Sequence, residues 1–501
     1  MLMLEQSGRL EFGEWLPDLP YYENPGLVEA KNAVPADGHY KDFLPLETTG
    51  SAIPTTPPMG AFAAIDSIGD AEIYVGSDTD LYELLSGAWT ARSAATYGTS
   101  TYWKFTQYED IVIATNNNQE IQSRTIGSAS NFAALATSGN SPVCQEVGVI
   151  NKFVFAGNLE ATLGGISAVQ WSAFDNPNDW PTPGGASANA VQAGRQILNP
   201  FYGKVTAITG GEFWGLVFQQ RAITRFTYEG GDTVFQVQTF DRNRGAWAPQ
   251  SVIQIGETVY FLASDGFYMT DGQSVKSLGH GKVDRWFFAE FDQTYRNNMT
   301  VAADHVNNCI YWSYTTPNAT NGIPDRIIIY NYEENRWSWA ENDLYLLFPS
   351  YTTGYTLDQL DSLYTSIDAM PTSLDSSLWQ GGISTIAGIG TDYKLGNFGG
   401  TASVATFETG EVDANPFGYV FVRGVRPLIT GDPTNITVAL SARTAQDNAG
   451  RSFGTNTQRT TRTGVCDFRT EGRFLSARVI ITGGFDRTVG IGVDMEQSSL
   501  A

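Results

Sequence analysis

Short apolar runs alternate with turn signals along most of the chain. Residues 258–263 (Thr-Val-Tyr-Phe-Leu-Ala) are rich in β-branched and aromatic side chains, the composition of a buried strand. Residues 264–266 (Ser-Asp-Gly) form a turn signal, because glycine accepts the positive φ that a tight hairpin requires. A second run, residues 267–270, ends at another Asp-Gly pair. This pattern predicts a β-hairpin.

The same unit recurs along the chain. Six copies are spaced by roughly 40–60 residues, the period of propeller blades of about four strands each. We therefore predict a six-bladed β-propeller over residues 61–342, and a large β-sandwich with repeated hairpins is the alternative. The copies are residues 69–82, 108–118, 149–157, 211–228, 256–272 and 304–337.

The flanking segments differ from these repeats. Residues 1–60 are proline-rich, which breaks long elements and predicts an extended arm with room for one helical turn at residues 28–32. Residues 343–400 are acidic and lack clean alternation, which indicates a linker or an inserted nozzle segment. Residues 401–501 return to strand patterns and predict a C-terminal β-sandwich platform domain joined by the arm. The predicted fold class is all-β.

The charge is large and unevenly distributed. The formal net charge is −23, and such a chain repels nucleic acid on average. Residues 420–490 carry ten Arg and five acidic residues, whereas residues 338–393 contain no Lys or Arg. The first ten residues lack the basic flank and apolar core of a signal peptide, and no run reaches the length of a membrane span. We expect a soluble protein made in a cytoplasm.

Residues with catalytic or metal-binding chemistry are sparse. The three cysteines, Cys144, Cys309 and Cys466, lie far apart, which favours small core residues over disulfides or a zinc site. The three histidines show no metal-ligand spacing, and no nucleophile elbow or phosphate loop occurs. We therefore expect no enzyme activity, no cofactor and no metal.

Glycan hydrolases and lectins are two other classes of function for which the chain has candidate residues. Asp358 and Asp361 could serve a glycosidase, but they lie in the linker-like segment without a basic partner. A sialidase would need clustered arginines, for which Arg221, Arg225, Arg242, Arg244 and Arg285 are available. A lectin would stack sugars on tryptophans, although packing between blades is the favoured interpretation of these side chains. They are Trp171, Trp180, Trp214, Trp247, Trp286, Trp312, Trp337 and Trp339.

Several segments, in this order, resemble the tail nozzle or hub proteins of short-tailed phages, also called tubular tail or DNA-stabilisation proteins. The resemblance covers nearly the whole chain. It rests on residues 14–20 (Glu-Trp-Leu-Pro-Asp-Leu-Pro), 60–63 (Gly-Ala-Phe-Ala), 171–180 (Trp-Ser-Ala-Phe-Asp-Asn-Pro-Asn-Asp-Trp), 244–249 (Arg-Gly-Ala-Trp-Ala-Pro), the acidic stretch 357–376 and the closing segment 472–478 (Gly-Arg-Phe-Leu-Ser-Ala-Arg).

The resemblance implies a structural virion protein that forms a homohexameric ring at the distal end of a short tail. Such a ring docks on a head-to-tail adaptor protein, carries tail fibres in some cases and surrounds the channel through which genomic DNA leaves without specific binding. The protein would be assembled in the host cytoplasm and reside in the virion. A glycan- or receptor-binding propeller of a phage tail is the alternative, followed by a glycan hydrolase.

The charge pattern suggests which residues would serve these roles. An acidic wall lets DNA slide because it offers no strong binding minima. The candidate channel-lining residues are Glu341, Asp343, Asp358, Asp361, Asp368 and Asp375. An arginine-rich domain suits contact with an acidic neighbour. The candidate subunit or ring contacts are Arg423, Arg426, Arg469, Arg473 and Arg478.

Overall fold

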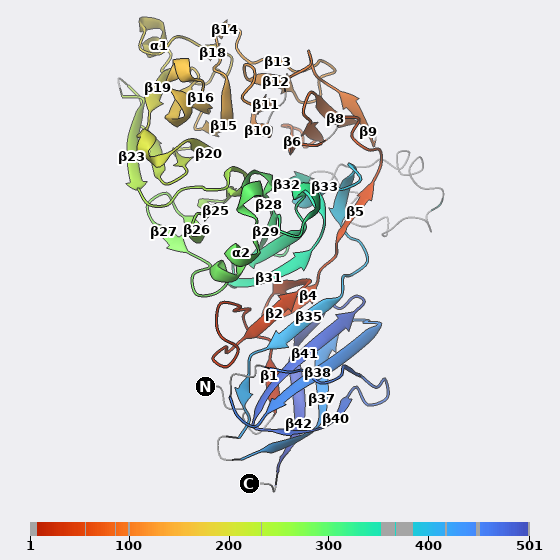
Figure 1. Ribbon diagram of the computed structural model, residues 1–501. Coiled ribbons are helices and arrows are strands. Elements are labelled where there is room, and N and C mark those ends of the chain that lie inside the picture. The colour runs from red at the N-terminus through yellow and green to blue at the C-terminus, as the bar shows by residue number, and fades with distance from the viewer. Residues whose placement is uncertain are drawn as a thin grey trace.

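The computed structural model describes residues 8–498 except residues 56, 86, 99–100, 232, 352–365, 367–383, 416–417 and 447–450. The fold is all-β, with 51% of residues in strands and 7% in helices, which confirms the predicted class. Figure 1 shows a ring of small sheets above a second body of long strands. The N-terminal strands lie between the two, and both labelled termini lie beside the second body.

Four-stranded antiparallel meanders build the ring. Within the described residues there are seven of them, which we call sheets one to seven. Sheet one is β6 (Gly60–Ile65), β7 (Ala71–Gly76), β8 (Leu81–Leu85) and β9 (Ala88–Ala91); sheet two is β10 (Lys104–Tyr108), β11 (Ile111–Thr115), β12 (Gln122–Thr125) and β13 (Ala133–Ala134). Sheet three is β15 (Cys144–Ile150), β16 (Phe153–Leu159), β17 (Ala168–Trp171) and β19 (Gly194–Ile197); sheet four is β20 (Val205–Gly210), β21 (Trp214–Gln219), β22 (Ile223–Tyr228) and β23 (Phe235–Asp241).

Sheets five to seven complete the set. Sheet five is β24 (Ile253–Ile255), β25 (Thr258–Ala263), β26 (Gly266–Thr270) and β27 (Val275–Ser277); sheet six is β28 (Thr300–Asp304), β29 (Cys309–Tyr314), β30 (Arg326–Asn331) and β31 (Arg336–Glu341). Sheet seven is β32 (Leu344–Tyr351), β33 (Ser384–Gly390), β34 (Leu395–Phe398) and β5 (Leu46–Thr49). Short elements between sheets are the β14 (Ser138–Gly139) and β18 (Asp179–Trp180) pair, α1 (Ala186–Ala190), α2 (Asp284–Glu290) and 3₁₀ turns η1 (Ala161–Leu163), η2 (Gly165–Ser167), η3 (Pro200–Tyr202), η4 (Pro249–Ser251), η5 (Gln293–Asn298) and η6 (Thr320–Gly322).

The seven sheets close on themselves. The first strands of successive sheets touch one another, with β6 against β10, β10 against β15 and so on, and β32 of sheet seven returns to β6 of sheet one. Sheets four and five meet through η4. An apolar core fills each of the seven gaps between neighbouring sheets, and the core between sheets five and six is continuous with that of the C-terminal region. Each sheet therefore buries both of its faces against its two neighbours.

The predicted count of six units missed sheet seven. All six predicted copies fall on sheets one to six, in order. Sheet seven lies in the segment predicted to be a linker, and its fourth strand comes from the N-terminal arm, where Thr48 pairs with Gly396. No contiguous repeat marks this sheet in the sequence, because its strands are separated by more than 300 residues.

Two sheets enclose the core of the C-terminal region. One runs β2 (Leu27–Lys31), β35 (Ala405–Thr409), β41 (Phe474–Thr482), β38 (Asn435–Arg443) and β39 (Thr457–Gln458), with β36 (Val412–Asp413) also on β41. The other runs β3 (Ala33–Ala36), β4 (His39–Asp42), β42 (Arg487–Gln497), β37 (Val420–Thr430) and β40 (Cys466–Gly472), with β1 (Arg9–Glu11) on β42. Alternating apolar residues of both sheets, among them Phe407, Val425, Val479 and Ile491, fill the space between them.

The N-terminal arm connects the ring to this region. Strand β2 occupies residues predicted to form a helical turn, because Leu27 and Ala30 are buried in the C-terminal core. One edge of β2 pairs with β35, and its Lys31 pairs with Trp339 at the edge of sheet six. Sheet six and the C-terminal sheet thus form one ten-stranded sheet. The arm is therefore part of both bodies.

Candidate functional site

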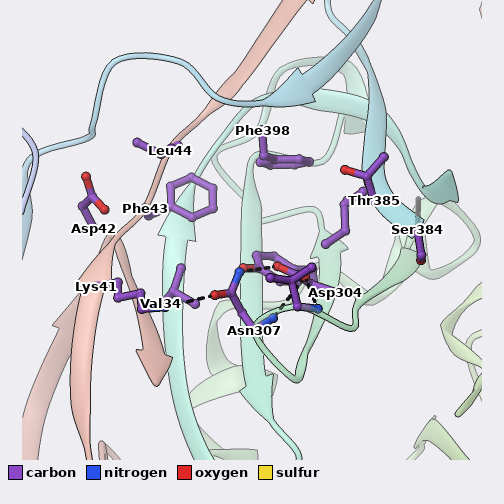
Figure 2. A pocket seen from close by; sticks show the side chains of 13 residues that line it. Val34, Lys41, Asp42, Phe43, Leu44, Asp304, Asn307, Ser384, Thr385 and Phe398 are labelled. Carbon is purple, nitrogen blue, oxygen red and sulfur yellow. Dashed lines mark hydrogen bonds between the residues drawn. The ribbon is translucent and has the colours of Figure 1, made fainter. Parts of the chain in front are cut away.

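A cleft of about 330 Å³ lies where the arm passes from the C-terminal region to the ring (Figure 2). Its lining comes from the arm, from the β28–β29 turn and from sheet seven, and is half apolar and half polar. Figure 2 shows the rings of Phe43 and Phe398 on its apolar side. The volume is that of a site for a small molecule or one side chain. The lining residues are Val34, Lys41, Asp42, Phe43, Leu44, Asp304, Val306, Asn307, Tyr311, Ser384, Thr385, Ile386 and Phe398.

The polar side of the cleft is internally bonded. Asp304 Oδ1 accepts from the backbone N–H groups of Val306 and Asn307, and Oδ2 accepts from Asn307 Nδ2 at 2.6 Å. Lys41 Nζ donates to Asn307 Oδ1 at 3.3 Å, as the dashed lines in Figure 2 indicate. Partial burial raises the pKa of Asp42. Since Asp304 and Asn307 satisfy one another, the cleft offers an apolar surface with one amine at its rim rather than an acid–base pair.

A second hollow of about 260 Å³ lies among the first strands of the ring sheets. Its lining includes the aromatic side chains of Phe62, Phe105 and Phe348, and Lys104 brings a cation to it. The whole lining is Ala61, Phe62, Trp103, Lys104, Phe105, Gln250, Val252, Ile253, Gln254, Thr300, Val301, Leu346, Leu347, Phe348 and Pro349.

A fully buried carboxyl group lies close to this hollow. Glu146 on β15 accepts a short hydrogen bond from the Tyr102 hydroxyl. Burial raises the pKa of Glu146 to about 7, while Lys104 and Lys204 lower it. The pKa of Tyr102 is raised by burial and by Glu146, so the tyrosine remains the donor. The pair contributes a protonatable group to the ring interior.

The candidate channel-lining acids divide into two sets. Glu341 ends β31 and is neutralised by Lys31 at 2.7 Å and Arg326 at 3.7 Å. Asp343 is exposed beyond it, and partial burial, Asp325 and Glu341 raise its pKa. Asp358, Asp361, Asp368 and Asp375 lie outside the described residues. Glu341 is therefore a poor source of negative charge, because two cations already contact it.

The candidate arginine contacts also fall into two groups, those paired with buried carboxylates and those exposed at the surface. Arg473 pairs with Asp413 at 2.8 Å, and Arg478 pairs with Glu408 at 2.8 Å. Arg443 and Arg451, on the same side of this sheet, pair with Glu411 and Glu408. These carboxylates lie at residues 408–413, just outside the window in which arginine was counted. Much of the apparent basic excess is therefore neutralised within the chain.

Three of the five candidates keep their guanidinium groups at the surface. Arg423, Arg426 and Arg469 are exposed on β37 and β40, in the outer face of the second C-terminal sheet. Arg423 pairs with Glu496, and both side chains are about half exposed. Asp467 and Asp494 are exposed on the same two-sheet region. This face is therefore of mixed charge rather than uniformly basic.

Sequence reasoning identified the core residues well and missed the ion-pair partners. The three cysteines are free and buried, and Trp171, Trp180, Trp312, Trp337 and Trp339 are buried, as core packing predicts. The acidic partners at 408–413 carry a signal that could have been found, namely three acids within six residues, from the end of β35 to β36. Among the described residues no three His, Cys, Asp or Glu side chains gather as metal ligands. None of the described helices is long and apolar enough to span a membrane.

Comparisons with known proteins give little. No family model matches the chain, and no curated protein matches it. A chain in a crystal structure of the mitotic checkpoint complex is similar with a TM-score of 0.37 and 9% identity over 70% of this chain and 97% of that one. The computationally designed Ika8 protein is similar with a TM-score of 0.35 and 9% identity, over 72% of this chain and 99% of that one. These likenesses are weak, and no conclusion about this chain follows from them.

Proposed function

We propose that this chain is a structural subunit of a short phage tail, a nozzle or hub that forms a homohexameric ring around the DNA exit path. The observation that carries the proposal is the ordered resemblance of residues 14–20, 171–180, 244–249 and 472–478 to that family. The continuous ten-stranded sheet adds support, since it joins the two bodies of the chain through β2. A subunit under mechanical load during ejection benefits from such a rigid connection.

The finer fold proposal is a seven-bladed β-propeller with a β-sandwich domain attached. The closed series of contacts from β6 to β32 supports the propeller, and the seven cores between neighbouring sheets support the blade count. Closure by β5 of the arm gives the last blade its fourth strand. Strand β5 thereby covers the edge that β34 would otherwise expose.

In the family that the chain resembles, the exit channel runs between subunits, so we place it there rather than through the ring of sheets. The net charge of −23 per chain would make the wall of such a channel acidic. Of the candidate contacts, the exposed Arg423, Arg426 and Arg469 are the ones free to face a neighbouring subunit or the adaptor protein, because Arg473 and Arg478 already have buried carboxylate partners.

Native mass spectrometry of the purified chain, alone and with the adaptor protein of its own phage, tests this proposal. The expected species is six copies of the 54.6-kDa chain on the adaptor ring. A chain that stays monomeric at all concentrations and never joins the adaptor would contradict the proposal.

The cleft in Figure 2 favours one alternative, a glycan- or receptor-binding role at a phage tail. The partly exposed ring of Phe398 beside polar groups resembles the mixture that sugar binding requires. A glycan array separates the two proposals. Binding that disappears in Phe398→Ala, while hexamer formation persists in the same variant, would assign a second role to this cleft.

A further inference from the structure

Two carboxyl groups face each other where the arm joins the C-terminal region. Glu29 on β2 lies directly opposite Glu408 on β35 in the antiparallel register. Like charges at such positions destabilise a strand pair. Glu408 is nearly buried and is held by Arg451 and by Arg478 at 2.8 Å. Glu408 therefore has two guanidinium partners of its own.

Glu29 has a different set of contacts. Its Oε1 accepts a hydrogen bond from Trp339 Nε1 at 2.5 Å, across the junction between β2 and sheet six. The cations nearest to it, Lys31 and Arg326, both contact Glu341 and lie over the Trp339 ring at 5.3 and 4.3 Å. Glu29 thus touches an indole N–H and a like charge, while the nearby cations are held by another carboxylate.

We propose that Glu29 is a proton-controlled latch between the ring and the C-terminal region. In its neutral form the carboxyl group lies beside Glu408 without repulsion and keeps β2 between its two partner strands. In its ionised form it is a partly buried charge whose nearby cations are held by Glu341, so the junction loosens. The latch is a property of the single chain and goes beyond the proposed role in a tail, so its test requires no assembly.

The direction of the titration agrees with this geometry. The pKa of Glu29 is raised to about 7, chiefly by burial and also by Glu408, although the Trp339 hydrogen bond, Lys31 and Arg326 act to lower it. A carboxyl group whose pKa is higher in the folded state stabilises that state while it is protonated. The stabilisation is complete below the ordinary value of 4.5 and is lost as the pH rises through about 7. The buried hydroxyl of Tyr314 faces the same junction, and burial raises its pKa far above this range.

Hydrogen–deuterium exchange of the full chain at pH 5 and pH 8, corrected for intrinsic exchange, tests the latch. We expect the protection of residues 27–31 and 405–409 to fall about tenfold or more between the two pH values, since one pKa unit corresponds to a factor of ten. Glu29→Gln should abolish this fall because it remains neutral. The matched control is Glu47→Gln on β5, an exposed strand glutamate, which should retain the fall.

A second variant tests the role of the Glu29 carboxyl group independently. Trp339→Phe removes the N–H donor that favours the ionised carboxylate, so the midpoint of the protection change should move to higher pH. An unchanged or lower midpoint would overturn the proposal. So would a wild-type chain whose protection is the same at both pH values, or a Glu29→Gln chain that keeps the wild-type fall.

Discussion

Each of the seven sheets has four strands, but sheet seven is assembled from two distant segments, whereas sheets one to six are not. Each of the first six comes from one contiguous stretch, such as residues 253–277 for sheet five. Sheet seven joins β32, β33 and β34 to a strand from residues 46–49. The C-terminal region resembles sheet seven, because β1 to β4 of the arm complete both of its sheets. Local hairpins thus build most of the ring, and one distant segment closes it and attaches the second body.

The two regions also handle charge differently. In the ring, Arg124 is fully buried between Glu72 and Glu83 at 3.1 Å each, a network confined to sheets one and two. In the C-terminal region, Arg451 and Arg478 share Glu408, which faces Glu29 of the arm. A local network stabilises the junction of sheets one and two, whereas the second network lies where three distant segments meet.

The largest expected effect comes from Trp15→Ala in the arm. Trp15 is fully buried, donates from Nε1 to Val28 at 3.0 Å and packs edge-on against Trp286 of α2. Removal of a buried tryptophan costs about 3–5 kcal/mol. We expect exchange protection to fall both in sheet six and in the C-terminal sheets, measured by hydrogen–deuterium exchange together with chemical denaturation.

Trp103→Ala is the matched control within the ring. Trp103 is as deeply buried, and its Nε1 donates to Ser77 at 2.7 Å inside the core between sheets one and two. The loss of stability should be of similar size, but the loss of exchange protection should be restricted to those two sheets. If Trp15→Ala leaves the C-terminal sheets protected, the arm does not couple the two regions.

A smaller effect is expected from Gly396→Ala on β34. A Cβ atom there would lie 2.6 Å from the Glu47 carbonyl oxygen of β5. Overpacking of this kind costs about 1–3 kcal/mol, so β5 should detach and residues 46–49 should exchange faster. Gly399→Ala is the control, since a Cβ atom at Gly399 meets open space. Equal behaviour of the two variants would mean that β5 contributes little to closure.

A pH-dependent effect is expected from Asp284→Asn in α2. Burial raises the pKa of Asp284 from 3.8 to about 7, and Asp18 and Asp265 add to the rise. The folded state therefore holds this proton more tightly than the unfolded state, so its contribution falls as the pH rises from 3.8 to about 7. Asparagine keeps the acceptor for the Phe267 N–H and stays neutral.

We expect Asp284→Asn to be more stable than the wild type by about 2 kcal/mol at pH 8 and equal to it at pH 4. Urea denaturation at the two pH values measures this difference. A variant that is less stable at pH 8 would show that the carboxylate is ionised and compensated in the fold.

The smallest effect on stability is expected from Arg426→Ala. Arg426 is exposed on β37, and surface substitutions change stability by less than about 0.5 kcal/mol. Under the proposed tail function the same change should weaken ring assembly, which native mass spectrometry measures. Arg478→Ala is the contrasting variant, since it removes one partner of the nearly buried Glu408 and should destabilise the chain itself.

The hairpins of the ring could be predicted because their signal is local. Turn pairs such as Asp265-Gly266 and the alternation around them identify strands that pair within a few residues. The strand patterns expected over residues 401–501 fall on strands of the structure, among them β37, β38 and β41. Strand β2 was predicted as a helical turn, because its five residues have no strand partner nearby in sequence.

The candidate channel and contact residues show that charge counted along the sequence does not predict which charges are neutralised in the fold. Glu341 was predicted to face a channel, yet Lys31 from the arm neutralises it across 310 residues of sequence. The arginine-rich window excluded Glu408, Glu411 and Asp413, which supply its counter-charges. A count along the chain cannot see an ion pair that forms across a sheet, because the distance between charges is set by strand order.

The sequence by itself determined the all-β class, six of the seven ring sheets and the buried positions of the cysteines. These depend on side-chain periodicity and turn chemistry, which act over a few residues. Only the tertiary structure decided the seventh sheet, the sharing of the arm between two bodies and the neutralisation of the arginines. These depend on which distant strands become neighbours, and that choice is made by the burial of apolar faces when the whole chain packs together.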